Sequence, residues 1–416
     1  MVQEAYEAAL DLLHESTVPA GYVASPSLPH YAAVWTRDAS ITSLGANVTG
    51  SDRLLECSRS TLETIASHAN EFGMVANAYW PSANYWDWGE SGCTDDQAWF
   101  IIAADSYHRA TDDSQFLREL WSALERCIGW LDHQDSTNFG LIDSPEAGDW
   151  MDSSLNRSGK VLHNNVLYLR ATEAMHRMAV SIGRTSAARD PADVRWAINA
   201  LFWPDRATDY AELLSRRVKY GTEPVEFPHP ASVAGFRAAA QDRGYYLAHV
   251  TFGTFADTCD VLANVMAILC DVASDERAET ILNHLATHGA IDPFPAKTWL
   301  KPAQESDNPW GLLKSGADRV QDPRWRNPPH SYHNGGIWPF IGGYYVMALV
   351  KVGREDEAVQ VINRLAEANL KSVGKKWGFN EWLHGVTGEP GGAEDQAWSA
   401  ATFVMAYHAL RDGARF

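Results

Sequence analysis

Helical periodicity recurs along nearly the whole of this 416-residue chain, whereas the two-residue alternation of a half-buried strand is almost absent. Nor do strands alternate with helices, as they would in a parallel sheet. We therefore expect an all-α protein of twelve or thirteen helices. The periodic segments are 2–15, 38–49, 51–69, 94–111, 113–134, 161–183, 190–202, 240–250, 255–272, 274–288, 336–352, 354–370 and 394–411.

These helices come in pairs of contrasting character. Residues 336–352 are apolar on most faces, which is typical of a helix surrounded by protein, whereas 354–370 carries one apolar and one polar stripe. The pair 94–111 and 113–134 repeats the contrast, with Asp and Ser or Thr residues at each start to cap the helix. An inner ring of helices inside an outer ring, that is, a helical barrel, is predicted.

Six long irregular segments separate the helices, at 16–37, 70–93, 135–160, 204–239, 289–335 and 371–393. Loops of this length are usually functional or disordered, and these are too rich in Trp, Tyr, Pro and His for disorder. We expect them to gather at one end of the barrel. No Gly/Ser-rich linker divides the chain, so residues 1–416 are predicted to form one domain.

Composition restricts the partners and the compartment. The formal charge of −19 would repel nucleic acid and anionic lipid, and no apolar run approaches the length of a membrane span. Five scattered cysteines without a CxxC pair indicate reduced thiols, and the acidic start has no apolar leader, so we expect a cytoplasmic protein. A homo-oligomer is compatible with the sequence.

Seventeen tryptophans are the unusual feature of the composition. Some belong to the core, but several lie beside Asp, Glu, Arg or Gly in predicted loops. Sugars present flat C–H faces that stack on aromatic rings, and hydroxyls that bind charged and amide groups. The pattern therefore favours a carbohydrate site. These loop tryptophans are Trp35, Trp86, Trp88, Trp150, Trp310, Trp338 and Trp382.

Hydrolysis of a glycosidic bond takes two carboxyl groups, one to protonate the leaving oxygen and one to activate water or attack the sugar. The segment Trp35-Thr36-Arg37-Asp38 offers an adjacent Arg and Asp for sugar hydroxyls, beside a ring for stacking; an N-cap Asp38 is the simpler interpretation. The segment 146–154 holds Asp149, Trp150 and Asp152, where apolar neighbours could raise a carboxyl pKa; a solvated acidic turn is the alternative.

The C-terminal part supplies the second carboxyl group. Glu381 lies between aromatic residues in a glycine-bounded loop, a poor place for a merely solvated acid. Two related stretches, 93–99 and 392–398, share Asp-Gln-Ala-Trp and each opens a predicted apolar helix. Helix capping would explain their acids. The repeated Gln-Ala-Trp predicts that two inner helices present the same polar group to a common cavity.

Several motifs together resemble those of a known family. They are Trp-Thr-Arg-Asp at 35–38, Gly-Asp-Trp-Met-Asp at 148–152, His-Asn-Gly-Gly-Ile-Trp-Pro at 333–339, Asn-Glu-Trp at 380–382 and Asp-Gln-Ala-Trp-Ser at 395–399. In this order they resemble the neutral/alkaline invertases and their prokaryotic relatives. More distantly, the chain is similar to trehalases, mannosylglycerate and glucosylglycerate hydrolases, and amylo-α-1,6-glucosidases. The similarity covers about residues 20 to 411.

The resemblance implies an (α/α)6 barrel and an inverting glycoside hydrolase acting on a short α-linked oligosaccharide or glycoside. The general acid falls on Asp152 and the general base on Glu381. With Trp86, Asp149 and Trp150 from the loops above, the implied sugar-binding residues are Trp35, Arg37, Asp38, Asp95, Trp99, His333, Asn334, Trp338, Gln396 and Trp398. Around the base this chain has Phe-Asn-Glu-Trp-Leu-His where plant invertases have Trp-Pro-Glu-Tyr-Tyr-Asp, so the sugar and linkage stay open.

For an inverting enzyme, the Asp152 and Glu381 carboxyl groups should lie roughly 6.5–9.5 Å apart. Two other functions compete. A sugar isomerase or epimerase could use His330, His333 or His384 as proton carriers, and a carbohydrate-binding protein could keep the pocket without turnover. No histidine or cysteine spacing indicates a metal site and no glycine loop indicates a nucleotide, so we expect no cofactor.

Overall fold

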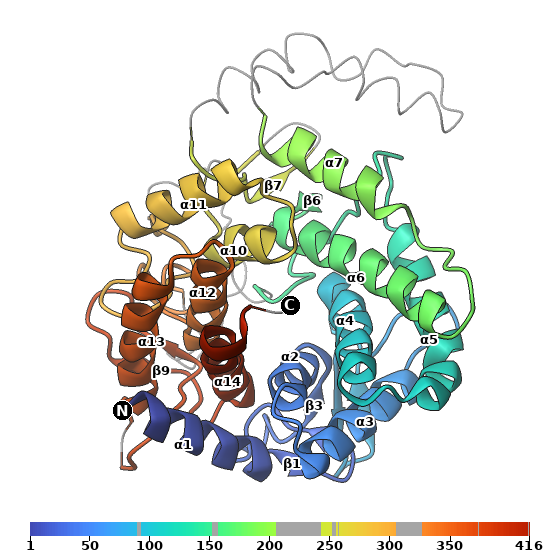
Figure 1. Cartoon of the computed structure of the whole chain (residues 1–416), viewed down its shortest axis with the longest axis horizontal. Helices are drawn as coiled ribbons and strands as arrows, with labels where there is room; N and C mark the ends of the chain where they lie inside the picture. The colour runs from blue at the N-terminus through green and yellow to red at the C-terminus, as the bar shows by residue number, and fades with distance from the viewer. Residues whose placement is uncertain are drawn as a thin grey trace.

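The computed structural model describes residues 1–89, 93–151, 157–204, 243–251, 255–256, 258–304, 327–372, 374–414 and 416 (Figure 1). Twelve α-helices lie in these ranges. They are α1 (Val2–Glu15), α2 (Thr36–Asn47), α3 (Asp52–Ser67), α4 (Thr94–Thr111), α5 (Ser114–Asp132), α6 (Leu162–Ser181), α7 (Pro191–Phe202), α10 (Val261–Leu269), α11 (Asp275–Thr287), α12 (Pro339–Lys351), α13 (Glu355–Leu370) and α14 (Ala397–Asp412).

The helices form two concentric rings (Figure 1). In the inner ring α2, α4, α6, α10, α12 and α14 contact one another in that order, and α14 returns to α2. Each inner helix packs on an outer one: α3, α5, α7, α11, α13 and α1 respectively. The predicted (α/α)6 barrel is confirmed, and the pairs 94–111 with 113–134 and 336–352 with 354–370 take the inner and outer places that their patterns predict.

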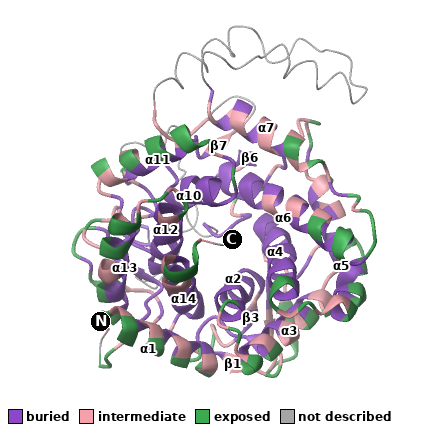
Figure 2. Cartoon of the chain, viewed as in Figure 1, coloured by how far each residue is buried: buried purple, intermediate pink, exposed green. Residues whose placement is uncertain are grey.

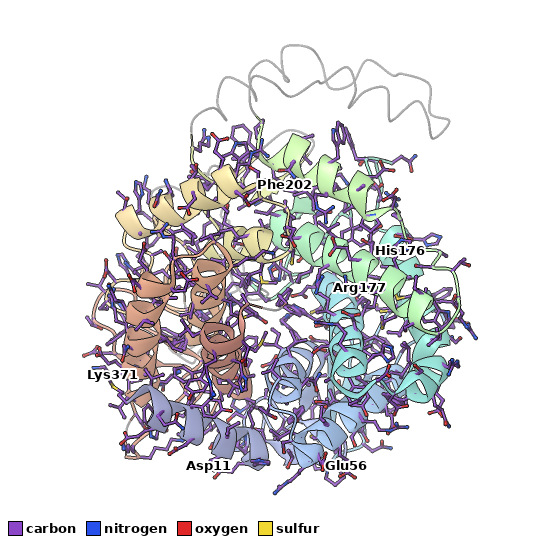
Figure 3. The ribbon with its side chains drawn as sticks, in the orientation of Figure 1. Asp11, Glu56, His176, Arg177, Phe202 and Lys371 are labelled. Carbon is purple, nitrogen blue, oxygen red and sulfur yellow. The ribbon has the colours of Figure 1, made fainter. Side chains whose placement is uncertain are left out.

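The inner and outer helices differ in how much of their surface is buried (Figure 2). Every residue of α2 and of α10 is buried, whereas α3 buries only one stripe, which includes Leu54, Leu62 and Ile65. Exposed side chains such as Asp11, Glu56 and Lys371 lie at the outer rim of the ring (Figure 3). An inner helix is enclosed by its neighbours and by an outer helix, so even the many polar residues of α2 are buried, whereas α10 is apolar except for Asn264.

Short antiparallel strand pairs connect the loops by backbone hydrogen bonds. They are β1 (Thr17–Val18) with β2 (Gly21–Tyr22), β4 (Ala78–Trp80) with β3 (Val34–Trp35) and β5 (Tyr85–Asp87), β6 (Lys160–Val161) with β7 (His249–Val250), and β8 (Trp382–Leu383) with β9 (Pro390–Gly391). Strands of two or three residues are too short to leave an alternation in the sequence.

Five of the six long segments lead into the N-terminus of an inner helix, so they meet at one end of the barrel, as expected; the sixth, 204–239, lies almost entirely outside the described residues. Contacts between them support this arrangement. Ile337 exchanges backbone hydrogen bonds with Leu383, and the Thr94 and Ala397 amides donate to Gly148 and Ala24 carbonyls at 2.7 and 2.9 Å. At the other end, the described connections from an inner helix to the next outer helix are short.

The predicted helix at 240–250 is wrong for its described part. Gly244 has a positive φ of 74°, and His249–Val250 forms β7. The Tyr246 amide donates to the Asn264 side chain at 2.8 Å and the Leu247 amide to the Phe202 carbonyl at 2.9 Å. These partners come from α10 and α7, so tertiary hydrogen bonds override a local helical pattern.

The inner helices α10, α12 and α14 begin later than predicted, and the cause is visible for the last two. Helix α12 starts at Pro339, because the preceding Ile337 is paired with Leu383, and a proline suits the first helical position. Helix α14 starts at Ala397, because Asp395 adopts a left-handed backbone with φ of 59°. Both delays leave loops of polar and aromatic residues at the same end of the barrel.

Candidate active site

Glu381 is buried at the mouth of the inner ring, immediately before β8, with 3% of its surface exposed. Its Oε1 accepts a hydrogen bond from the Tyr31 hydroxyl at 2.8 Å, and its Oε2 accepts one from the Ala393 amide at 3.0 Å. The Glu381 amide in turn donates to the Ala393 carbonyl at 2.7 Å. The carboxylate is therefore held from both sides by groups that favour its charged form.

Tyr31 was not among the predicted site residues, and it lies 350 positions before Glu381 in the chain. Burial and the nearby Glu381 carboxylate raise its pKa well above the ordinary tyrosine value. The phenol therefore keeps its proton and acts as a donor. The only available signal was its place in an aromatic loop just before the Trp-Thr-Arg-Asp motif.

Arg37 forms a buried bidentate ion pair with Asp95. Its Nε lies 2.8 Å from Oδ2 and its Nη2 lies 2.9 Å from Oδ1, while His163 Nε2 lies 3.5 Å from the same Oδ2. Burial alone would raise the pKa of Asp95, but Arg37 and His163 hold it well below its usual range. Burial instead raises the pKa of the adjacent Asp96. The two neighbouring carboxyl groups thus have pKa values shifted in opposite directions, although Arg37 Nη2 also lies 3.7 Å from Asp96 Oδ1.

This ion pair changes the expected role of the Arg-Asp motif. Two N–H groups of Arg37 donate to Asp95. These two groups are therefore not available to bind sugar hydroxyls together with Asp38. Asp38 is buried in the first turn of α2, close enough to Tyr31 and Asp96 to raise the pKa of both. The simpler interpretation of Asp38 as an N-cap is wrong, since Trp35 occupies the cap position.

A cluster of buried rings lies at the N-terminal ends of the inner helices α12 and α14. We call these rings, together with Trp99, His163 and Gln396, the aromatic floor. Trp150 packs edge-on against His333 and Trp338, with centroids 5.1 and 5.4 Å apart, and His333 stacks on Trp338 at 5.0 Å. Trp338 also contacts Trp398 at 5.9 Å. The structure thus brings together four predicted residues from three separate segments.

Unpaired polar atoms occur within the aromatic floor. The indole nitrogens of Trp99, Trp150 and Trp398 have no hydrogen-bond partner among the described residues, and neither has either amide atom of Gln396. His163, which sequence reasoning missed, lies between Trp99 and Trp150, with ring centroids 6.5 and 6.4 Å away. Buried polar atoms are costly when unsatisfied, so this cluster suits a ligand with many hydroxyl groups.

His333 is fully enclosed in the aromatic floor. Burial and the positive charges of Arg157 and Arg37 lower its pKa well below the ordinary histidine value. Its imidazole is therefore neutral and functions as a flat ring and a hydrogen-bonding group rather than as a cation.

Comparison with known proteins agrees with this geometry. The model of the family described as amylo-alpha-1,6-glucosidase matches residues 8–405. The chain belongs to this family. Its sequence is 24% identical over 347 residues to neutral/alkaline invertase 1, mitochondrial, of Oryza sativa subsp. japonica, covering 76% of this chain and 52% of that protein. It is 31% identical over 174 residues to probable alkaline/neutral invertase F of Arabidopsis thaliana, covering 41% of this chain and 32% of that protein.

The chain thus spans about half or less of the length of these curated relatives. Among solved structures, the mannosylglycerate hydrolase of Thermus thermophilus in complex with Tris superimposes with a TM-score of 0.63 at 15% identity. That match covers 96% of this chain and 98% of the other. At this identity the likeness shows the fold alone, and it confirms the barrel of this amylo-α-1,6-glucosidase family member.

Asp149 is committed to a buried ion-pair network. Arg157 Nε and Nη2 donate to its carboxylate at 2.7 to 3.2 Å, and Arg157 Nη1 also pairs with Asp260, the N-cap of α10. The Asp149 Oδ1 further accepts from the Met151 amide at 2.8 Å. Asp152 lies outside the described residues, as does Trp310, so the predicted separation of Asp152 from Glu381 stays a prediction.

The side chains of two other predicted site residues contact other parts of the protein. The strand register places Trp86 opposite Tyr79, on the face of the sheet turned away from Trp35, where its ring lies 5.2 Å from His68. The Asn334 amide is used by the backbone, accepting from the Ala303 amide at 2.8 Å and donating to the Ala303 carbonyl at 3.0 Å. We therefore leave Trp86 and Asn334 out of the sugar-contacting set.

The repeated Asp-Gln-Ala-Trp does not give equivalent structures. In α4 the Gln97 amide, when oriented so that its nitrogen faces acceptors, donates to the carbonyls of Cys93 and Thr94 at its own helix start, at 2.6 and 3.1 Å. Gln396 instead precedes α14. The two glutamines therefore lie at different positions relative to their helices, and the prediction that they share a common cavity stays a prediction.

Across the described ranges, no group of three His, Cys, Asp or Glu side chains is arranged to hold a metal ion. The five cysteines are buried free thiols. No helix in the same ranges is both long and apolar enough to cross a membrane.

Proposed function

We propose that the chain is an inverting glycoside hydrolase that cleaves an α-glycosidic bond of a short oligosaccharide or glycoside. Glu381 is the general base and Asp152 the general acid. The observation that carries the proposal is the buried Glu381 carboxylate, fixed by the Tyr31 hydroxyl and the Ala393 amide. The buried thiols favour a reducing compartment such as the cytoplasm.

The reaction needs Glu381 in its ionised form. In inversion, the base takes a proton from a water molecule as its oxygen attacks the anomeric carbon, while the acid protonates the glycosidic oxygen on the other face. Two donated hydrogen bonds stabilise the carboxylate and fix its direction, so the attacking water meets a preoriented acceptor. Tyr31 acts on the water only through Glu381 and is therefore a positioning residue.

The contacts of Asp149 support Asp152 as the acid. A group that gives its proton to a glycosidic oxygen must be protonated and must reach the substrate. Asp149 is enclosed with Arg157 in a buried ion pair, and its oxygens face a guanidinium rather than the aromatic floor. Asp152 is the next carboxyl in the same loop, three residues further on.

The aromatic floor is the proposed binding place for the cleaved sugar. Its rings offer apolar surfaces to sugar C–H faces, and Gln396, His163 and the indole nitrogens of Trp99, Trp150 and Trp398 offer polar partners to hydroxyls. The named relatives are invertases and a mannosylglycerate hydrolase, so we propose an α-linked, sucrose-like or related glycoside as the substrate.

The test is a panel of α-linked disaccharides, including sucrose, maltose, isomaltose and trehalose, followed by NMR to identify the anomer released first. We expect hydrolysis of one or more of them with inversion. Asp152→Asn and Glu381→Gln should each lower kcat by at least about 10³-fold, an order expected for loss of an acid or a base. Unchanged hydrolysis in either variant, or release of the retained anomer, would contradict the proposal.

A further inference from the structure

We propose that the sheet β3–β4–β5 is a binding platform for the sugar units of the leaving group, so that the protein prefers substrates longer than a disaccharide. The platform consists of the rings of Trp35, Trp80 and Tyr85. This inference rests on the proposed function, since it assigns further units of the same substrate to a second surface.

The strand register places these three rings on one face. Trp35 pairs with Ala78, and Trp80 pairs with Tyr85. Because side chains alternate along a strand, Ala78 and Trp80 share a face, and their cross-strand partners share it with them. Tyr79 and Trp86 form the next pair and lie on the opposite face.

The rings follow one another without a gap. The Trp80 centroid lies 5.4 Å from that of Trp35 and 5.7 Å from that of Tyr85. Trp35 lies 6.4 Å from Tyr31, whose hydroxyl donates to Glu381. A continuous aromatic path therefore runs from the proposed general base to Tyr85.

Exposure increases along this path. Trp35 and Trp80 are partly buried, and Tyr85 is 55% exposed. The aromatic floor, by contrast, is closed, since Trp99, Trp338 and Trp398 are 1%, 1% and 5% exposed. A sugar bound on the floor ends the substrate there, and the remaining units can continue only toward the open side. The platform is thus on the leaving-group side of the cleaved bond.

The hairpin that carries Trp80 and Tyr85 is preorganised. Its turn is closed by hydrogen bonds from the Ala83 amide to the Trp80 carbonyl at 3.2 Å and from the Tyr79 hydroxyl to the Asn84 side chain at 3.2 Å. Exposed aromatic rings on a fixed backbone suit the flat apolar faces of a neutral sugar, because little conformational entropy is lost on binding.

The proposed platform predicts that activity increases with the length of the substrate. Substitutions in the β4–β5 hairpin test this prediction. Activity is measured on three series: maltose to maltotetraose, isomaltose to isomaltotriose, and sucrose with 1-kestose. We expect the ratio of kcat/KM for the longer substrate to that for the disaccharide to exceed one in the hydrolysed series. Tyr85→Ala should lower this ratio about tenfold, an order typical of one lost stacking contact. Trp80→Ala should lower it at least as much.

Trp86→Ala is the matched control, because Trp86 lies on the same hairpin, is 42% exposed and faces the other way. It should leave the ratio as in the wild type. A ratio in Tyr85→Ala within twofold of the wild-type value, or an equal fall in Trp86→Ala, would overturn the platform while the hydrolase activity stands.

Binding separates this inference from the proposed function. Titration of the Asp152→Asn variant with glucose, maltose and maltotetraose, followed by tryptophan fluorescence, reports affinity without turnover, and Tyr85→Ala is added to the same variant. The platform predicts tighter binding of maltotetraose than of maltose and loss of that gain in Tyr85→Ala. If no substrate in the panel is hydrolysed, the proposed function fails, and equal affinities for maltose and maltotetraose then refute the platform as well.

Discussion

A single glycine determines where the proposed general base can lie. Gly392 has φ of 70°, and a Cβ atom built on it would lie 2.2 Å from Glu381 Oε2. The neighbouring Ala393 amide donates to that same oxygen. Any side chain at position 392 must therefore displace the carboxylate from its hydrogen bonds, in addition to straining the backbone.

Gly392→Ala should lower kcat by about 100-fold, because a shift of about 1 Å in a catalytic group can cost that much. Gly353→Ala is the control, since its φ is 79° but no heavy atom lies within 4 Å of the added Cβ. Both variants carry a similar backbone strain, but the Cβ added at 392 also lies 2.7 Å from the Trp382 ring. The thermal midpoint of Gly392→Ala should therefore fall further, and at a temperature where both variants are folded only Gly392→Ala should lose activity. Equal kcat values in the two variants would show that Glu381 does not depend on this contact.

At the scale of elements, a buried triad joins a loop to an inner helix. Arg157 pairs with Asp149 in the loop before β6 and with Asp260, whose other oxygen accepts from the Ala263 amide at 2.9 Å at the start of α10. All three side chains are at most 2% exposed. Removing the arginine would leave two carboxylates in a medium that solvates them poorly.

Arg157→Met should therefore lower the free energy of unfolding by roughly 3–5 kcal/mol, as measured by urea denaturation. Adding Asp149→Asn and Asp260→Asn to this variant should recover part of the loss, because the buried charges disappear together. Lys376→Met removes one partner of an exposed ion pair with Glu4 and should leave the denaturation midpoint close to that of the wild type. A small effect of Arg157→Met would mean that water reaches the triad.

For the whole molecule, a partly buried histidine, His249, makes stability depend on pH. Burial, together with the charge of Arg157, lowers the pKa of His249 to about 4, while Asp149 opposes the shift. The unfolded chain binds a proton at this histidine near its ordinary value of 6.5, but the folded chain does so only near pH 4. The stability contribution of His249 is therefore fully present above pH 6.5 and is lost as the pH falls from 6.5 to 4.

His249→Asn should remove this dependence. The difference in unfolding free energy between the wild type and the variant should change by about 3 kcal/mol between pH 7.5 and pH 4, with the wild type losing more. Other groups titrate in both proteins and cancel in the difference, including Asp96, whose raised pKa acts in the opposite direction. Parallel stability curves would show that His249 is solvated when folded.

The sequence alone predicts the helices where each pattern is local. Residues 94–111 form α4 at the predicted bounds, because the acids of its first turn and the apolar run 98–104 are local signals. The segment 240–250 fails, because its hydrogen bonds go to α7 and α10. Periodicity reports which face is buried, but it carries no information on partners far along the chain.

The same division holds for the candidate site. Glu381 could be singled out from its aromatic, glycine-bounded loop, and the family resemblance was confirmed over residues 8–405. Only the tertiary structure showed that Tyr31 supports Glu381, that Arg157 occupies Asp149, and that Trp80 and Tyr85, rather than Trp86, share a face with Trp35. Residue chemistry and helical period are local properties of a sequence, whereas these pairings depend on strand register and on contacts between segments as much as 350 residues apart.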